Sequence, residues 1–281
     1  MRVRSLVTGR KHSRLRGRGL DFDELKHYRP GDDIRALDWR VSRRRGEPYV
    51  RVYTEERDRP VWLIVDQRGS LFFGSQHQMK SVAAAKTAAS LAWQVLASGD
   101  RVGAVILGDD GAQAFTPKRA ETALIRWLSA LASANQTLAE TSNAATKVTM
   151  AEALAMVDRY SHHDALIVVV SDFSDWGDDC TSLVRKLHRH NDVIALEVSD
   201  PLERDLNLAD KLIVSDGRHQ LEIQGDQDAM LANFRQSYDQ HINRIETELQ
   251  RDHIPLLRLD SAVNAQVLLH RDGLSQVMAQ G

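Results

Sequence analysis

The stretch Val61-Trp62-Leu63-Ile64-Val65-Asp66-Gln67-Arg68-Gly69-Ser70 joins an uninterrupted apolar run to a short polar loop. A continuous apolar run of this length is typical of a strand that is buried on both faces of a sheet. A long Ala-rich segment, Met79 to Ala97, follows the loop and is typical of a helix. A strand, a loop and a helix in this order form the opening of a βα unit, which predicts a parallel sheet.

The same alternation continues along the chain. Because strands that alternate with helices pack as a mostly parallel sheet covered on both faces, we expect an α/β fold. Beyond residue 226, a long helical pattern and a short apolar run at Ile254 to Leu259 predict a helix and a strand that pack on the main domain. The other strand signals are Val102 to Leu107, Leu166 to Val170, Val193 to Val198 and Leu212 to Val214, and the helical candidates lie near Ala120 to Ala132, Met150 to Tyr160 and Cys180 to His190.

The first 57 residues differ in charge from the rest of the chain. They contain 16 Lys and Arg against 9 Asp and Glu, although the whole chain has a formal net charge of -2. This split favours attraction of the amino-terminal part either to an acidic partner or to the acidic remainder of the chain. Tyr49-Val50-Arg51-Val52-Tyr53 alternates in polarity and predicts a half-exposed strand. We expect four parts: a basic flexible arm at 1–18, a small strand-containing segment at 19–57, the main domain at 58–225 and a carboxy-terminal helix and strand at 226–281.

Composition excludes several classes of protein. Cys180 is the only cysteine, so the chain forms no intrachain disulfide and shows no sign of an oxidising compartment. The longest apolar runs, such as Ala165 to Val170, are far too short for a signal peptide or a membrane span, so we expect a cytoplasmic protein. The sequence has no Gly-rich phosphate loop followed by Lys and Ser or Thr, which indicates that the chain is not itself an ATPase.

Two acidic residues directly follow predicted strands. Asp66 comes after Val61 to Val65, and Asp172 comes after Leu166 to Ser171. Ligands of an open parallel sheet bind beyond the carboxyl ends of its strands, so we expect both carboxylates at one edge. Ser70 and Thr149 can bring hydroxyl groups to the same edge. The alternative is that these residues only cap the helices that follow.

This arrangement resembles a von Willebrand factor A domain, a family that places an Asp-x-Ser-x-Ser loop, a Thr and a second Asp around a divalent cation. The match runs through Asp66, Ser70, Thr149 and Asp172, which would be the metal ligands if Mg²⁺ binds. Arg68 stands in place of the first Ser, and a guanidinium cannot ligate a cation. Either Mg²⁺ or Arg68 can balance the two carboxylates, and we favour Arg68 as a built-in cation with no cofactor.

Four stretches ahead of the first buried strand carry a second pattern: Gly19-Leu20-Asp21-Phe22-Asp23-Glu24-Leu25, Tyr28-Arg29-Pro30-Gly31-Asp32-Asp33-Ile34-Arg35, Asp38-Trp39 and Glu55-Glu56-Arg57-Asp58. They resemble the signature of the domain-of-unknown-function 58 family over about residues 15 to 220. Members of that family are similar to von Willebrand A proteins and are associated with MoxR-type AAA+ ATPases. The resemblance therefore implies an adaptor or co-chaperone that works beside such an ATPase.

The residues of this signature also have local physical interpretations. Pro30 and Gly31 predict a tight turn in which the Asp residues cap the next turn. The interleaved charges favour a lattice of ion pairs. Trp39 is most simply a packing anchor, and its alternative is partner recognition. The lattice would comprise Arg35, Asp38, Arg40, Glu55, Glu56 and Arg57.

We expect a non-enzymatic protein-binding adaptor that docks a MoxR-type AAA+ ATPase through one edge of its sheet. One alternative is a metal-dependent hydrolase or nuclease that uses Asp66 and Asp172, but no His or Glu lies at a spacing that names a general base. The other is a nonspecific nucleic-acid binder that uses the basic arm. Phe72 has two interpretations, an exposed contact for the partner or packing under the loop. The predicted partner-binding residues are Asp66, Arg68, Ser70, Phe72, Thr149 and Asp172.

Overall fold

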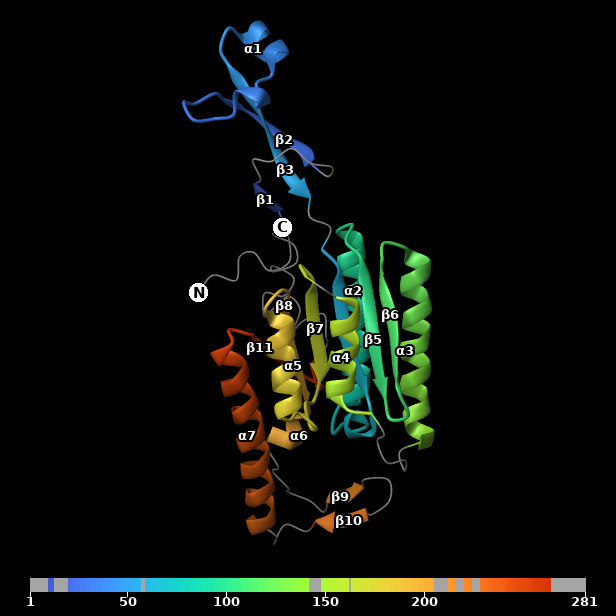
Figure 1. The fold of residues 1–281 in the computed structure, drawn as a ribbon. Helices are drawn as coiled ribbons and strands as arrows, with labels where there is room; N and C mark the ends of the chain where they lie inside the picture. The colour runs from blue at the N-terminus through green and yellow to red at the C-terminus, as the bar shows by residue number, and fades with distance from the viewer. Residues whose placement is uncertain are drawn as a thin grey trace. The chain divides into compact units, whose positions relative to one another are not determined.

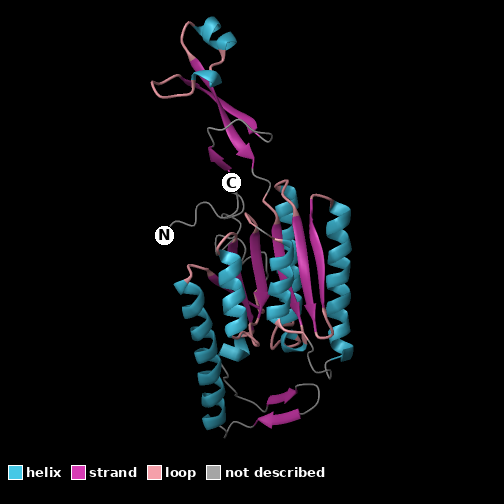
Figure 2. Ribbon diagram, in the orientation of Figure 1, coloured by secondary structure: helices cyan, strands magenta, loops and turns pink. Residues whose placement is uncertain are grey.

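The computed structural model describes residues 10–12, 20–56, 59–141, 148–161, 163–204, 212–215, 220–223 and 228–263. The chain divides into two compact units, a larger one at 59–276 and a smaller one that comprises residues 1–58 and 277–281. Figure 1 traces the elements in chain order, and Figure 2 distinguishes helices from strands.

Six strands form the central sheet of the larger unit: β4 (Val61–Gln67), β5 (Val102–Gly108), β6 (Ala112–Lys118), β7 (Leu166–Ser171), β8 (Asp192–Ser199) and β11 (Leu256–Asp260). Their order across the sheet is β11-β8-β7-β4-β5-β6. Only the edge strand β6 of this sheet runs antiparallel to its neighbour. The strand order reverses direction between β4 and β7, as it does in doubly wound folds, and such a reversal opens a crevice at the carboxyl ends of the strands.

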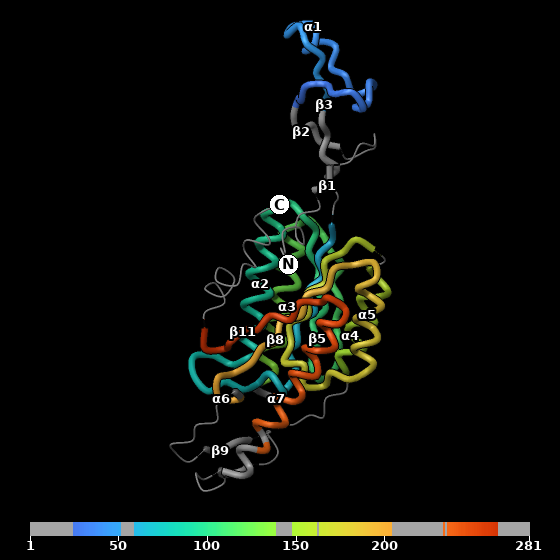
Figure 3. The backbone as a smooth tube through the Cα atoms, turned by 90° about the vertical axis from the view of Figure 1, so that its left-hand side faces the viewer, coloured from blue at the N-terminus to red at the C-terminus, as the bar shows by residue number. Residues whose placement is uncertain are grey.

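Helices cover both faces of this sheet: α2 (Lys80–Ala97) and α3 (Glu121–Thr141) on one face, and α4 (Met150–Tyr160), α5 (Asp178–His188) and α7 (Asp228–Arg251) on the other. Figure 3 shows the sheet between α2 and α3 on one side and α4 and α5 on the other. The apolar cluster beneath α4 and α5 also takes in Ile242, Ile245 and Leu249 of α7. The predicted mostly parallel α/β fold is therefore confirmed.

Every residue of β4 and of β7 is buried. Both strands lie in the interior of the sheet and are covered by helices on both faces, which is why their sequences are continuously apolar rather than alternating. The two strands that were predicted from their apolar runs, β4 and β7, therefore lie at the centre of the core.

One expected strand pairs elsewhere. The run at 212–214 forms β9 (Leu212–Ser215), which pairs antiparallel with β10 (Gln220–Ile223) in a separate hairpin that follows the short helix α6 (Pro201–Arg204). The last place in the central sheet belongs to β11, which lies parallel to β8. Strands joined by a few residues pair antiparallel, whereas the long helix α7 carries the chain back so that β11 can run parallel.

The smaller unit contains β1 (Arg10–His12), β2 (Leu20–His27), β3 (Tyr49–Glu56), the 3₁₀ turn η1 (Ile34–Ala36) and helix α1 (Trp39–Arg45). Its three strands are antiparallel in the order β1-β3-β2. The predicted strand at 49–53 is thus confirmed, and Gly31, at a φ of 104°, occupies the predicted turn. Of the predicted basic arm, only Arg10–His12 is described, and it forms the edge strand β1, which pairs with β3. The rest of the arm lies outside the described residues.

Among the described residues of the family signature, Asp38 has an ionic partner in Arg51 of β3. Asp38 accepts hydrogen bonds from Arg51 Nε at 2.8 Å and from the backbone amide groups of Arg40 and Val41, and the Arg51 bond is the main reason that the pKa of Asp38 is lowered. The side chains of residues 55–57 lie outside the description. The prediction that Trp39 is a packing anchor is wrong, because 71% of this residue is exposed. Trp39 is the first residue of α1, where the cap at Asp38 fixes the backbone.

Candidate functional site

The two acidic residues singled out from the sequence lie at the carboxyl ends of adjacent strands. Asp66 is the next-to-last residue of β4, and Asp172 directly follows β7, which pairs with β4. This is the point at which the strand order reverses, where ligands of doubly wound sheets bind. The candidate site is therefore the crevice beyond β4 and β7.

Asp66 is completely buried and is saturated by hydrogen-bond donors. Arg68 donates from Nε to Asp66 Oδ1 at 2.9 Å, from Nη2 to Oδ2 at 2.7 Å and from its backbone amide to Oδ1 at 3.1 Å. Ser171 Oγ donates to Oδ2 at 2.6 Å. Burial raises the pKa of Asp66, and the Arg68 guanidinium opposes this rise. Each oxygen of Asp66 thus accepts two hydrogen bonds, which fills its lone pairs.

The other side of the Arg68 guanidinium pairs with a residue that the sequence analysis missed. Nη1 donates to Asp175 Oδ2 at 2.6 Å and Nη2 donates to Asp175 Oδ1 at 2.8 Å, while Met150 donates its backbone amide to Oδ2 at 2.9 Å. Burial works against the charge on Arg68, but the hydrogen bonds from Arg68 to Asp175 and Asp66 outweigh it and raise the pKa of Arg68. Burial also works against the charge on Asp175, but the Arg68 hydrogen bond prevails and lowers the pKa of Asp175. The charged guanidinium of Arg68 therefore pairs with two carboxylates, those of Asp66 and Asp175.

These residues do not fit a divalent cation. A metal at Asp66 would need a free carboxylate oxygen, but both oxygens are occupied by Arg68 and Ser171. Within the described ranges, no three His, Cys, Asp or Glu side chains are grouped so that they could hold a metal ion. Ion binding at Asp66 would require Arg68 to leave.

Asp172 is balanced by Lys80 rather than by Arg68, which corrects the expectation that one guanidinium serves both carboxylates. Lys80, the first residue of α2, donates from Nζ to Asp172 Oδ2 at 3.1 Å and to Glu203 Oε1 at 2.6 Å. Lys80 is almost fully buried; burial would lower its pKa, but Asp172 and Glu203 together raise it.

Asp200 fixes the loops around the crevice. It follows β8 and accepts hydrogen bonds from the hydroxyl and backbone amide of Ser75, from the backbone amide of Leu202 and from the hydroxyl of Ser261. These donors lower the pKa of Asp200 even though burial opposes them. Asp109, after β5, likewise accepts a hydrogen bond from the amide of Gly69 at 3.0 Å. Carboxylates at the carboxyl ends of four strands therefore hold the rim of the site in one arrangement.

The two predicted hydroxyl residues lie at the rim. Ser70 is exposed in a 3₁₀ turn, Gly69–Leu71. Thr149 caps α4: its Oγ1 accepts a hydrogen bond from the Glu152 amide at 3.3 Å, and Glu152 accepts one from the Thr149 amide at 2.9 Å. The structure thus shows Thr149 in the capping role that was the alternative to ligand binding. Phe72, next to the fully buried Leu71, is half-buried.

Replacing Thr149 by alanine is expected to lower the free energy of unfolding by about 1 kcal/mol, because one end of the capping box is lost. Urea denaturation followed by circular dichroism measures this difference. Thr149→Ser keeps the hydroxyl and serves as the control, with an expected loss well below that of Thr149→Ala. Equal stability of Thr149→Ala and the native protein would contradict the capping role.

The family model that matches this chain describes a family of unknown function. The model of the family described as "Protein of unknown function DUF58" matches residues 24–248. The uncharacterized proteins Rv1480 of Mycobacterium tuberculosis and Mb1516 of Mycobacterium bovis are each 29% identical over 200 residues, which cover 69% of this chain and 59% of theirs. The chain thus matches less than two thirds of the length of these relatives.

Among solved structures, the chain is similar to the conserved hypothetical protein BatB from Bacteroides thetaiotaomicron, at 12% identity and a TM-score of 0.47 over 79% of this chain and 100% of that one. It is also similar to the SpRpn10 VWA domain, at 11% identity and a TM-score of 0.40 over 79% of this chain and 95% of that one. Within the described part of the chain, no helix combines the length and the apolar character that crossing a membrane requires.

Proposed function

This chain belongs to the family described as "Protein of unknown function DUF58", and we propose that it is a non-enzymatic adaptor that binds a protein partner at the crevice beyond β4 and β7. The partner that the proposal names is a MoxR-type AAA+ ATPase, because the family signature resembles that of proteins associated with such ATPases. The von Willebrand A-like arrangement of Asp66, Ser70, Thr149 and Asp172 supports a binding role.

The observation that carries the proposal is the saturation of Asp66. A catalytic carboxylate needs a free oxygen to take a proton or to hold a metal. Arg68 and Ser171 donate hydrogen bonds to both oxygens of Asp66, and Lys80 donates hydrogen bonds to both Asp172 and Glu203. The buried part of the edge is thus a fixed platform, which supports binding through the groups at its rim.

The rim offers an acidic hollow beside this platform. A cavity of about 390 Å³ is lined by Thr149, Ala151, Asp175, Gly177, Asp178, Asp179 and Cys180. The side chain of Asp175 is 30% exposed, and that of Asp178 is 91% exposed, although Asp178 pairs with Arg244. We expect a Lys or Arg of the partner to enter this hollow, because exposed carboxylates select a partner surface of opposite charge.

Two rim substitutions test this proposal, Ser70→Arg and Asp179→Asn. The first adds bulk and charge on the exposed turn, and the second removes a carboxylate from the hollow. We expect each variant to bind a purified MoxR-type AAA+ ATPase about tenfold more weakly than the native protein in biolayer interferometry, with the larger effect for Ser70→Arg.

Matched controls lie at the opposite edge of the sheet. Ala97→Arg adds the same charge at the exposed carboxyl end of α2, and Glu121→Gln removes an exposed carboxylate from the first turn of α3, as Asp179→Asn does for α5. Both controls are expected to bind like the native protein. Native affinity of Ser70→Arg and Asp179→Asn, with an unchanged circular dichroism spectrum, would remove this edge from the interface.

A further inference from the structure

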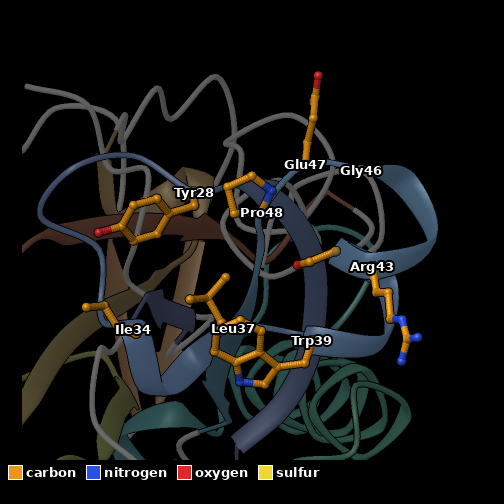
Figure 4. Close-up of a pocket in the computed structure, with 9 residues that line it drawn as sticks. Tyr28, Ile34, Leu37, Trp39, Arg43, Gly46, Glu47 and Pro48 are labelled. Atoms are coloured by element: carbon orange, nitrogen blue, oxygen red, sulfur yellow. The ribbon is translucent and has the colours of Figure 1, made fainter.

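A second surface lies on the smaller unit and is independent of the crevice. An open hollow of about 750 Å³ is bounded by η1, α1, the residue that follows β2 and the loop that precedes β3. Two large apolar residues are unusually exposed there, Trp39 at 71% and Ile34 at 62%. Figure 4 shows its lining residues, which are Tyr28, Ile34, Leu37, Trp39, Ser42, Arg43, Gly46, Glu47 and Pro48. We call this surface the signature groove, since Tyr28, Ile34 and Trp39 of its lining belong to the family signature.

Backbone hydrogen bonds fix the groove in shape. Tyr28 donates its amide to Pro48 O at 2.8 Å, and Asp38 donates its amide to Tyr49 O at 2.8 Å. Leu37 forms an isolated bridge with Val50, a buried residue of β3. The exposure of Trp39 is therefore built into the position at which α1 begins, rather than being the result of a loose side chain.

Helix α1, which lines the groove with Trp39, Ser42 and Arg43, is basic. Arg40, Arg43 and Arg44 are exposed on α1, a helix that contains no acidic residue, and none of them forms an ion pair within the described ranges. Glu47, the acidic residue of the groove lining, pairs with His27 at 3.1 Å. In Figure 4, the guanidinium of Arg43 extends away from the apolar lining. The surface thus combines an apolar hollow with a basic helix along one side, of which Arg43 belongs to the lining.

We propose that the signature groove binds an acidic segment of a partner protein that inserts one aromatic or long aliphatic side chain. The anchor packs against Ile34, Leu37 and Trp39, and the carboxylates on either side pair with the arginines of α1. Trp and Arg are the residues that contribute most to protein interfaces. A hollow lined by Ile34, Leu37 and Pro48 together with aromatic residues suits an inserted side chain better than it suits a flat bilayer. Single-stranded nucleic acid stacks on several exposed aromatics, and of the two aromatic residues in the lining only Trp39 is exposed.

An array of ten-residue peptides tests the proposal with the full-length protein as the probe. Four sets are compared: acidic with a Phe, Trp or Leu anchor, acidic with Ser in place of the anchor, basic with an anchor, and neutral with an anchor. We expect retention of acidic anchored peptides alone, and a loss of about tenfold or more in affinity for the best of them in Trp39→Ser and in Arg43→Glu.

The matched controls are Trp93→Ser and Arg126→Glu, which change an exposed Trp on α2 and an exposed Arg on α3. Both are expected to bind the best acidic peptide with native affinity. Equal retention of acidic peptides with and without the anchor, or equal affinity of the native protein and Trp39→Ser for the best acidic peptide, would overturn the proposal. So would binding to phosphatidylserine vesicles or to single-stranded oligonucleotides that exceeds binding to every acidic peptide.

Discussion

Replacing Arg68 by alanine is expected to lower the free energy of unfolding by about 3–5 kcal/mol. The change leaves Asp66 fully buried and Asp175 partly buried with no cation to balance them. A buried carboxylate that loses its partner must either keep a costly charge or take up a proton. Equilibrium unfolding in urea at pH 7, followed by tryptophan fluorescence, measures the loss.

Two further substitutions show whether the loss in Arg68→Ala comes from the buried ion pairs of Arg68. Arg68→Lys keeps the charge but loses the planar fork that pairs with both carboxylates, so its expected loss lies between those of the native protein and Arg68→Ala. Arg185→Ala breaks an exposed pair with Asp252 and is expected to cost less than about 1 kcal/mol. A loss in Arg68→Ala no larger than that in Arg185→Ala would show that Arg68 is not the structural cation of the crevice.

Titration with Mg²⁺ by calorimetry tests whether Arg68 prevents a divalent cation from binding at Asp66. The native protein is expected to show no saturable heat, because Arg68 occupies the oxygens of Asp66. Arg68→Ser supplies a hydroxyl and frees these oxygens, and it is expected to bind Mg²⁺ and to recover stability when Mg²⁺ is added. Stoichiometric binding by the native protein would contradict the role of Arg68 as a built-in cation.

Replacing Lys80 by methionine is expected to lower the free energy of unfolding by about 2–4 kcal/mol at pH 7. The substitution keeps the bulk of the buried stem but leaves Asp172 and Glu203 facing each other without a cation. The expected loss is smaller than for Arg68, because Arg68 balances Asp66, which is completely buried, whereas the side chains of Asp172 and Glu203 are 8% and 18% exposed and each retains some solvation.

The Lys80→Met loss is expected to shrink as the pH falls from 7 to 5. Burial already raises the pKa of Glu203, and Lys80 opposes this rise, so removing Lys80 raises the pKa further. A carboxyl with a raised pKa in the folded state binds its proton more tightly there than in the unfolded chain. Its stabilising contribution is complete below the unfolded pKa and is lost as the pH rises through the folded pKa. Urea midpoints at both pH values measure the change.

Two controls separate this effect from general acid sensitivity. Lys186→Met removes an exposed partner of Asp158 and is expected to show a small loss that is the same at both pH values. Adding Glu203→Gln to Lys80→Met removes the titrating group and is expected to abolish most of the pH dependence. If the loss in Lys80→Met is equal at pH 5 and pH 7, Glu203 is not the group that takes up the proton.

The sequence predicted the strands at the centre of the sheet because strands that are buried on both faces have continuously apolar sequences. β4 and β7 are covered on both faces, and only uninterrupted apolar residues satisfy that environment. The edges were harder to predict. β6 alternates between half-buried and exposed residues and contains Pro117, so it carries no comparable run. The strand at 212–214 was found, but its pairing in a hairpin was not, because an apolar run does not specify its neighbour.

The candidate site was predicted in the same partial way. Asp66 and Asp172 were located because each follows a buried strand, and Arg68 was recognised because it interrupts the Asp-x-Ser-x-Ser pattern. Asp175 and Glu203 were missed because nothing in their local sequence distinguishes them from solvated acidic residues. Each became part of the site only through a cation that lies more than 100 residues earlier in the chain.

The sequence alone determined that this chain is an α/β protein with carboxylates at the carboxyl ends of its central strands, since runs of apolar residues and their lengths are local features of the sequence. Only the tertiary structure decided which cation meets which carboxylate, because ion pairing depends on distances of a few ångströms between distant segments. It also decided that Trp39 faces solvent, since exposure depends on what packs against a side chain. A Trp beside arginines has the same sequence whether it lies in a core or on a surface.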